Sequence, residues 1–167
     1  DYPQYVNVKY PWEMTEDIMP PEIPRVYNPV GIYSRTFTAD KADGGRLFLR
    51  FEGIESCGEV YVNGSFVGYS EGSFTPAEYD ITDYVKDGEN QLVVKVLRWC
   101  DGSWLEDQDF WRLAGIFRDV YLYSLPEVYV SDWRVDALLD ENYQDGILTV
   151  EAQIEGDTRD CGLMLEL

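Results

Sequence analysis

The sequence predicts an all-β protein whose main domain is a two-sheet β-sandwich. Three observations indicate this: short segments in which apolar and polar residues alternate, turn residues between them, and a high aromatic content. Tyr, Phe and Trp make up 15% of the 167 residues, and tyrosine leads with 13. Aromatic side chains suit pleated, half-buried strands. About eight short strands with turns between them, and no convincing helix, are typical of a sandwich.

Residues 1–30 predict an irregular arm. Prolines at positions 3, 11, 20, 21, 24 and 29 exclude long helices and central strands. The piece YVNVKYPWE alternates briefly and is expected to be extended. Two interpretations stay open from the residues alone: an arm wrapped on the sandwich, or an arm that presents Asn7, whose amide can donate to and accept from a sugar hydroxyl.

Alternation and turns then define the strands in order. The Asn63-Gly64 pair is a strong hairpin signal between two of them. The segment at residues 90–99 is apolar on both faces, which indicates a central strand. Strands are expected at 33–39, 46–52, 59–62, 66–69, 79–84 and 90–99, followed by a long connection, Asp101 to Val120, and a further strand toward Ser124.

After Pro126 the pattern starts again. Residues 128–138 and 147–154 alternate, and 163–167 is expected to begin a further strand. Three strands cannot close a sandwich, which needs about seven. The prediction is therefore one sandwich over residues 1–126 and an incomplete second domain over 127–167, in a chain that is part of a longer protein.

Composition excludes several function classes. The formal net charge is −19, from 13 basic and 32 acidic residues. Such a surface repels phosphate backbones and anionic membranes, so neither nucleic acid nor a membrane is expected as a partner. Without histidine, a Ser-His-Asp or Cys-His site is excluded. Cys57, Cys100 and Cys161 lack the spacing of a zinc site or disulfide framework, and they favour a reducing compartment such as the cytoplasm.

The connection from Asp101 to Val120 combines carboxylates with aromatic rings. Sugars stack on rings and donate hydroxyls to carboxylates, so the loop suits a sugar, but it equally suits rings packed under a sandwich. Packing is the expectation for Trp104, Phe110 and Trp111. Paired carboxylates can cleave glycosides, yet Glu106 or Asp107 with Asp109 lie too close in sequence to flank a bond. No catalytic residue is expected, and Arg112 and Arg118 are expected to pair with acidic neighbours.

Four ordered motifs cover about the first 126 residues: YVNVKYP (5–11), NPVGIYSRTF (28–37), VNGSFVGYSEGSFTPAEYDIT (62–82) and LEDQDFWRLAGIFRDV (105–120). Together they resemble the N-terminal sugar-binding domain of bacterial β-galactosidases of glycoside hydrolase family 2. The GIFRDV piece alone would indicate only the wider family, with its β-glucuronidases and β-mannosidases. The resemblance implies a jelly-roll sandwich for 1–126 and the first strands of an immunoglobulin-like sandwich for 127–167.

The resemblance also implies site residues. Asp109 would contact the galactosyl ring and a sodium ion, Asn7 would contact galactose, and Val8 would add a wall contact. Asp101 and Glu71 match a divalent-ion site, for magnesium, away from the reaction centre, although the family often has Gln at position 71.

In the resembled family both catalytic glutamates lie on a (β/α)8 barrel absent from this chain. The chain alone is therefore expected to be inactive, and the full-length protein to hydrolyse terminal β-D-galactosides such as lactose as a homo-oligomer. The alternatives are a free-standing carbohydrate-binding module and a domain of a β-glucuronidase or β-mannosidase.

Overall fold

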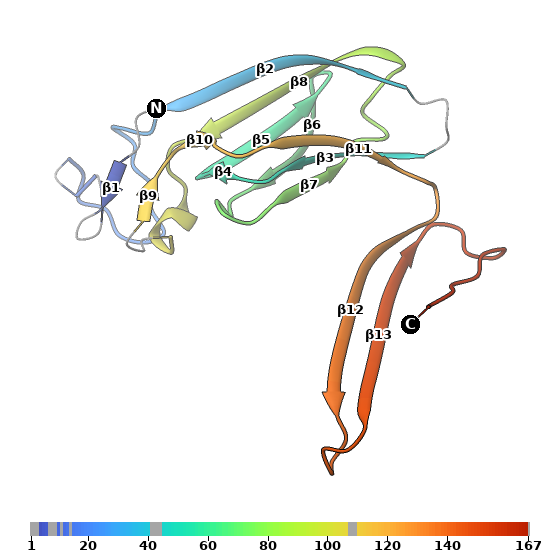
Figure 1. The fold of residues 1–167 in the computed structure, drawn as a ribbon. Helices are drawn as coiled ribbons and strands as arrows, with labels where there is room; N and C mark the ends of the chain where they lie inside the picture. The colour runs from blue at the N-terminus through green and yellow to red at the C-terminus, as the bar shows by residue number, and fades with distance from the viewer. Residues whose placement is uncertain are drawn as a thin grey trace. The chain divides into compact units, whose positions relative to one another are not determined.

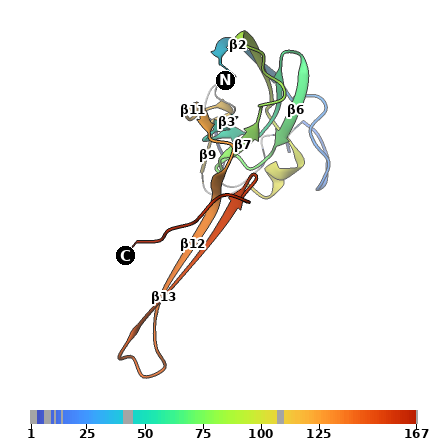
Figure 2. The ribbon, with the colours of Figure 1, turned by 90° about the vertical axis from the view of Figure 1, so that its right-hand side faces the viewer.

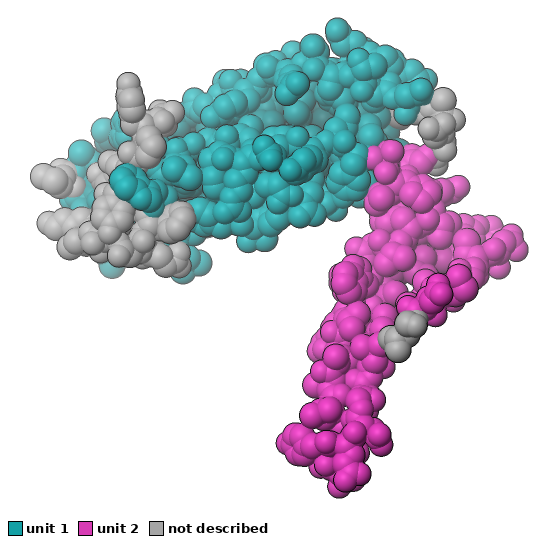
Figure 3. Space-filling model, viewed as in Figure 1, with its two compact units in different colours: residues 1–43, 47–123 teal, residues 44–46, 124–167 magenta. Residues whose placement is uncertain are grey.

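A computed structural model describes residues 4–6, 10, 12–13, 15–40, 45–106 and 110–166. Within these ranges the regular structure is β except for one 3-10 turn, η1 (Asp101–Trp104), so the all-β prediction is confirmed (Figure 1). No helix in the described part of the chain is long and apolar enough to cross a membrane. The chain forms two compact units, residues 1–43 with 47–123, and 44–46 with 124–167 (Figure 3). The domain boundary after residue 126 stays a prediction.

Two antiparallel sheets build the sandwich of the first unit. The four-stranded sheet has the order β2-β8-β5-β6, and the other has the order β11-β3-β7. The predicted central strand is confirmed, because β8 lies between β2 and β5. The bounds are β2 (Val30–Ala39), β8 (Gly88–Leu97), β5 (Cys57–Val62), β6 (Ser65–Ser70), β11 (Val120–Leu125), β3 (Arg46–Phe51) and β7 (Ala77–Asp80).

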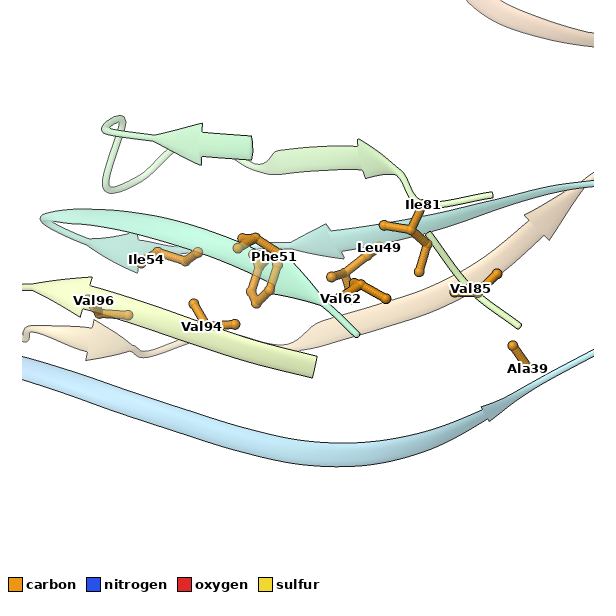
Figure 4. Packing of buried hydrophobic residues seen from close by; sticks show 10 residues of the cluster. Ala39, Leu49, Phe51, Ile54, Val62, Ile81, Val85, Val94 and Val96 are labelled. Carbon is orange, nitrogen blue, oxygen red and sulfur yellow. The ribbon is translucent and has the colours of Figure 1, made fainter. Parts of the chain in front are cut away.

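Side chains from both sheets meet in one hydrophobic core (Figure 4). Val60 of β5 is fully buried, and Val94 of β8 is buried beside it in the same sheet. Leu49 and Phe51 of β3 face them from the other sheet. The alternation of apolar and polar residues along β3 and β5 therefore has the predicted cause, because alternate side chains point into the space between the two sheets.

The structure contains two short antiparallel strand pairs that were not predicted. β4 (Ile54–Glu55) pairs with β10 (Gly115–Ile116), and β1 (Gln4–Val6) pairs with β9 (Phe110–Arg112). The second pair connects the proline-rich arm to the long acidic loop.

The second unit contains one hairpin, made by β12 (Tyr129–Leu139) and β13 (Gly146–Glu155), which run side by side in both views (Figure 1, Figure 2). The expected strand at 163–167 is wrong for its described part, because residues 161–166 have no regular structure. Trp133 and Leu138 remain 69% and 65% exposed. A lone two-stranded hairpin is marginally stable in water.

We therefore expect limited trypsin digestion of the 167-residue chain to cut the second unit first. Arg134 and Arg159 are exposed there, whereas Arg98 and Arg112 are buried in the sandwich. Mass spectrometry over a digestion time course should show cleavage at 134 and 159 before cleavage at any sandwich site. Equal rates at Arg134 and at sandwich positions such as Arg50 would contradict the expectation.

Candidate functional site

The β1–β9 ladder brings the arm to the acidic loop. Its pairs are Gln4 with Arg112, Tyr5 with Trp111, and Val6 with Phe110. The first residues of the arm therefore lie beside the loop, and the presentation of Asn7 stays a prediction. The predicted sugar contacts Asn7, Val8 and Asp109 follow or precede this ladder in sequence and lie outside the described residues.

Glu55 holds the far end of the loop. Its Oε2 accepts hydrogen bonds from the backbone N–H groups of Leu113, at 2.6 Å, and Ala114, at 3.2 Å. Arg112 and Arg98, both buried, lie near enough to interact with its charge. Burial raises the pKa of the Glu55 carboxyl above its ordinary value of 4.5, although the two N–H donors and the two arginines act in the opposite direction. The carboxyl is thus a structural anchor for the loop.

Replacing Glu55 with Gln is expected to change how stability depends on pH. The native state holds the Glu55 proton more tightly than the unfolded chain does. The contribution of this group to the free energy of unfolding is therefore present at low pH, and it is lost as the pH rises above the ordinary pKa of a glutamate. Glutamine keeps the shape and cannot ionise. The free energy of unfolding of wild type minus that of Glu55→Gln should therefore fall as the pH rises above about 4.5, the ordinary pKa of a glutamate.

Urea unfolding at several pH values measures this difference. The exposed Glu141→Gln serves as the matched control and should show no such trend. A difference for Glu55→Gln that stays constant or grows with pH would contradict the role assigned to burial.

An aromatic cluster lies beneath the start of the loop. Trp12 lies 4.9 Å from Trp99 and 5.1 Å from Trp104 between ring centroids, and Tyr10 stacks on Trp12 at 4.9 Å. The Tyr10 hydroxyl donates to the Trp104 carbonyl at 2.7 Å, and Trp104 Nε1 donates to the Glu22 carbonyl at 2.8 Å. The packing role predicted for Trp104 is therefore confirmed.

The other rings and the arginines of the loop differ from the expectations in part. Trp111 is 55% exposed, so it is buried only in part, and the Phe110 side chain lies outside the described residues. The Arg112 guanidinium lies over the rings of Tyr10 and Trp99 and interacts with Glu55. Arg118 is structural, but its partners are the carbonyls of Glu52 and Phe74 rather than carboxylates.

Glu106 ties the loop to the segment that carries Glu71. Its carboxylate accepts from the backbone N–H of Ser73 at 2.8 Å and from the Ser73 hydroxyl at 2.5 Å. Ser73 is fully buried and Glu106 is partly buried, so this contact is partly shielded from water. A carboxylate engaged in this way is a cross-link between loops.

Next to this cross-link, three potential metal ligands converge. One ligand atom each from Glu71, Cys100 and Asp101 lies within 4.8 Å of the others. The structure thus brings together the two residues predicted for a divalent ion, and it adds a thiol that the sequence did not predict there. Whether an ion binds stays a proposal.

A chain of hydrogen bonds fixes the backbone that presents Cys100 and Asp101. The Cys100 N–H donates to the Ser103 hydroxyl at 3.1 Å, and that hydroxyl donates to Ser56 at 3.1 Å. The Ser56 hydroxyl in turn donates to the Arg98 carbonyl at 2.8 Å. Ser56 and Ser103 are both buried, so the turn η1 is held by a network inside the protein.

Cys57 lies behind Cys100. Both thiols are free, 1% and 5% exposed, and hydrogen-bonded to each other. This hydrogen bond lowers the pKa of Cys57 and raises that of Cys100, because the first thiol to ionise accepts the remaining S–H. Both thiols line a pocket of about 460 Å³, together with Glu59, Tyr69 and Asp101.

No motif in the sequence indicated this thiol pair. Cys57 pairs in register with Leu97 of β8, and Cys100 follows three residues later, so only the sheet brings the two together. Glu55 was likewise missed, because an isolated glutamate in a strand carries no motif.

A β-sandwich with a loop that combines carboxylates and aromatic rings is compatible with a carbohydrate-binding domain. Comparison with known families makes this specific. The family described as glycosyl hydrolases family 2, sugar binding domain, matches residues 1–126, and the chain belongs to it.

Among curated proteins, the chain is 56% identical over 165 residues to a beta-galactosidase of Priestia megaterium, covering 96% of this chain and 16% of that protein. Among solved structures, a putative beta-galactosidase from Bacteroides fragilis is 27% identical with a TM-score of 0.67, covering 77% of this chain and 20% of the other. A beta-glucuronidase of Ruminococcus gnavus is 28% identical with a TM-score of 0.66, covering 78% and 25%. The chain therefore spans about a sixth of the curated relative's length.

Proposed function

We propose that this chain is the sugar-binding domain of a β-galactosidase that hydrolyses terminal β-D-galactosides such as lactose. The observation that supports this choice is the identity of 56% to a beta-galactosidase across 96% of the chain. A free-standing carbohydrate-binding module is less favoured, because the matched relative is about six times longer. A β-glucuronidase or β-mannosidase remains the alternative that substrate assays decide.

We infer that the domain supplies contacts to a galactose site whose reacting groups lie elsewhere in the same polypeptide. Asn7, Val8 and Asp109 are the proposed contacts, and the ladder that ends at Val6 and Phe110 supports pairing the arm with the loop. An amide and a carboxylate together can donate to and accept from sugar hydroxyls. Asp109 would also contact a sodium ion, since a hard cation prefers oxygen ligands.

The divalent ion is a separate proposal at Glu71 and Asp101. Their two carboxylates fit a hard ion such as magnesium, which keeps several waters and takes one or two carboxylates. The Cys100 sulfur within 4.8 Å of both does not fit, because magnesium selects oxygen over thiol. No step of the reaction is assigned to this ion.

The catalytic glutamates are proposed to lie on a (β/α)8 barrel in the remainder of the polypeptide, in a protein that assembles as a homo-oligomer. Within the described residues, Glu106 is bound to Ser73 and Glu55 to Leu113 and Ala114, so neither carboxylate faces an open site with a second one. The domain would bind and orient the sugar, while the barrel would break the bond.

The test compares the isolated 167-residue chain with the full-length protein on nitrophenyl β-galactoside, β-glucuronide and β-mannoside. We expect no turnover above the blank for the chain alone, because the acid and the nucleophile are proposed to lie on the barrel. The full-length protein should prefer the galactoside. Turnover by the isolated chain, or faster turnover of the glucuronide or mannoside by the full-length protein, would contradict the proposal.

A further inference from the structure

We propose that Glu71, Cys100 and Asp101 bind a thiophilic divalent cation of the zinc or cadmium type in preference to magnesium. The inference rests on the proposed function only in taking Glu71 and Asp101 as metal ligands. It concerns which ion these residues select, and it does not depend on which glycoside the full-length protein cleaves.

The geometry supports a single mononuclear site. One sulfur and two carboxylate oxygens lie within 4.8 Å of one another, which is close enough for all three to approach one ion. Metal–sulfur bonds of about 2.3 Å and metal–oxygen bonds of about 2.0–2.2 Å span such distances with small side-chain movements. The three residues come from two segments, after β6 and after β8, which Glu106 and Ser73 hold together.

The donor set decides the kind of ion. Thiolates select zinc and other soft or borderline cations, whereas magnesium requires a near-octahedral set of oxygens. Cys100 is 5% exposed and presents its sulfur from the side of the protein interior, while Glu71 and Asp101 are exposed and close the site from the solvent side. An ion at this place would therefore meet the sulfur as well as both carboxylates.

The neighbourhood offers an entry path and a second sulfur. The pocket of about 460 Å³ is lined by Cys57, Cys100 and Asp101, so an ion can reach the thiol from solvent. Cys57 lines the same pocket as Cys100 and brings a second thiol beside it. Binding exchanges the Cys100 thiol proton for the metal, and the proton passes to the buffer, so no oxidant or reductant takes part.

The experiment is a cadmium titration of the reduced full-length protein, followed by ultraviolet thiolate-to-cadmium charge-transfer absorbance and by equilibrium dialysis. We expect a saturable band, with one cadmium ion per chain bound in excess of the amount that Cys100→Ser binds. In Cys100→Ser the band should vanish. Cadmium affinity should fall at least about tenfold, because even the loss of a residue that only orients a metal ligand costs about 10–100-fold in metal affinity. A large excess of magnesium should leave the wild-type band unchanged.

Two matched variants separate this site from other thiols. Cys57→Ser makes the same substitution at an equally buried neighbour and should keep the band, and Cys161→Ser tests the exposed thiol of the second unit and should behave as wild type. The proposal is overturned if Cys100→Ser keeps the band, if Cys57→Ser loses it as fully as Cys100→Ser, or if magnesium displaces cadmium. The readout does not use galactoside turnover, so this proposal and the proposed function fail separately.

Discussion

Asp109→Asn is expected to lower kcat/KM of the full-length protein on a galactoside about ten- to hundredfold. The substitution keeps the shape of the side chain and removes its charge. Loss of a charge-assisted hydrogen bond to a hydroxyl costs about 1.5–3 kcal/mol, and loss of the sodium ion should add to it. The response of the rate to sodium should become flat, because the variant lacks the carboxylate proposed to contact that ion.

The measurement is kcat/KM as a function of sodium concentration for wild type, Asp109→Asn and Asn7→Ala. Asn7→Ala should cost less, since a neutral hydrogen bond contributes about 0.5–1.5 kcal/mol. Melting curves serve as the control, and neither change should move them much. If Asp109→Asn keeps the wild-type kcat/KM and the same sodium response, Asp109 is a surface charge and the site assignment fails.

Phe51→Ala is expected to lower the free energy of unfolding by about 3–5 kcal/mol. Phe51 is 1% exposed and lies in the core between the sheets, in edge-on contact with the ring of Tyr79 at 6.3 Å. Removing the ring takes away buried apolar area and leaves a cavity that a β-sandwich closes only in part. This is a large share of the about 5–15 kcal/mol that stabilise an ordinary domain, so the variant should unfold at a markedly lower urea concentration than wild type.

Urea unfolding of Phe51→Ala beside Phe66→Ala tests this expectation. Phe66 is 53% exposed on β6, so its replacement removes the same atoms from a half-solvated place and should cost less than about 1 kcal/mol. Equal losses for the two variants would mean that the core does not lie where β3 and β5 place it.

The sequence predicted the parts of the fold that depend on local patterns. The apolar alternation on both faces of residues 90–99 identified the central strand β8, and Asn63-Gly64 identified the hairpin of β5 and β6. Such signals are local: one depends on the period of the strand and the other on residues that tolerate a positive φ, as Asn63 does at 51°.

The features that the sequence missed depend on tertiary pairing. The pairs β4–β10 and β1–β9 have two or three residues a side, too short to show a period. Cys57 approaches Cys100 because of the register of β5 on β8, and the spacing of the cysteines in the sequence does not reveal this register. At residues 163–166 the opposite error occurred: apolar residues there suggested a strand, but the described chain has no neighbour with which they pair.

For the candidate site, the sequence supplied the residues and the structure supplied part of their arrangement. Glu71 and Asp101 are distant in sequence and adjacent in space, because the contact of Glu106 with Ser73 closes the two loops on each other. The roles of Asn7, Val8 and Asp109 remain predictions that rest on their motifs and on the ladder beside them.

The most direct test of the central claim is a crystal structure of the full-length protein with bound galactose. We expect side chains of this domain to reach the sugar bound at the catalytic barrel, with Asn7 and Asp109 at hydrogen-bond distances of about 2.7–3.2 Å from galactose hydroxyls. A galactose bound at the barrel with no residue of this domain in contact with it would contradict the proposed role of the domain.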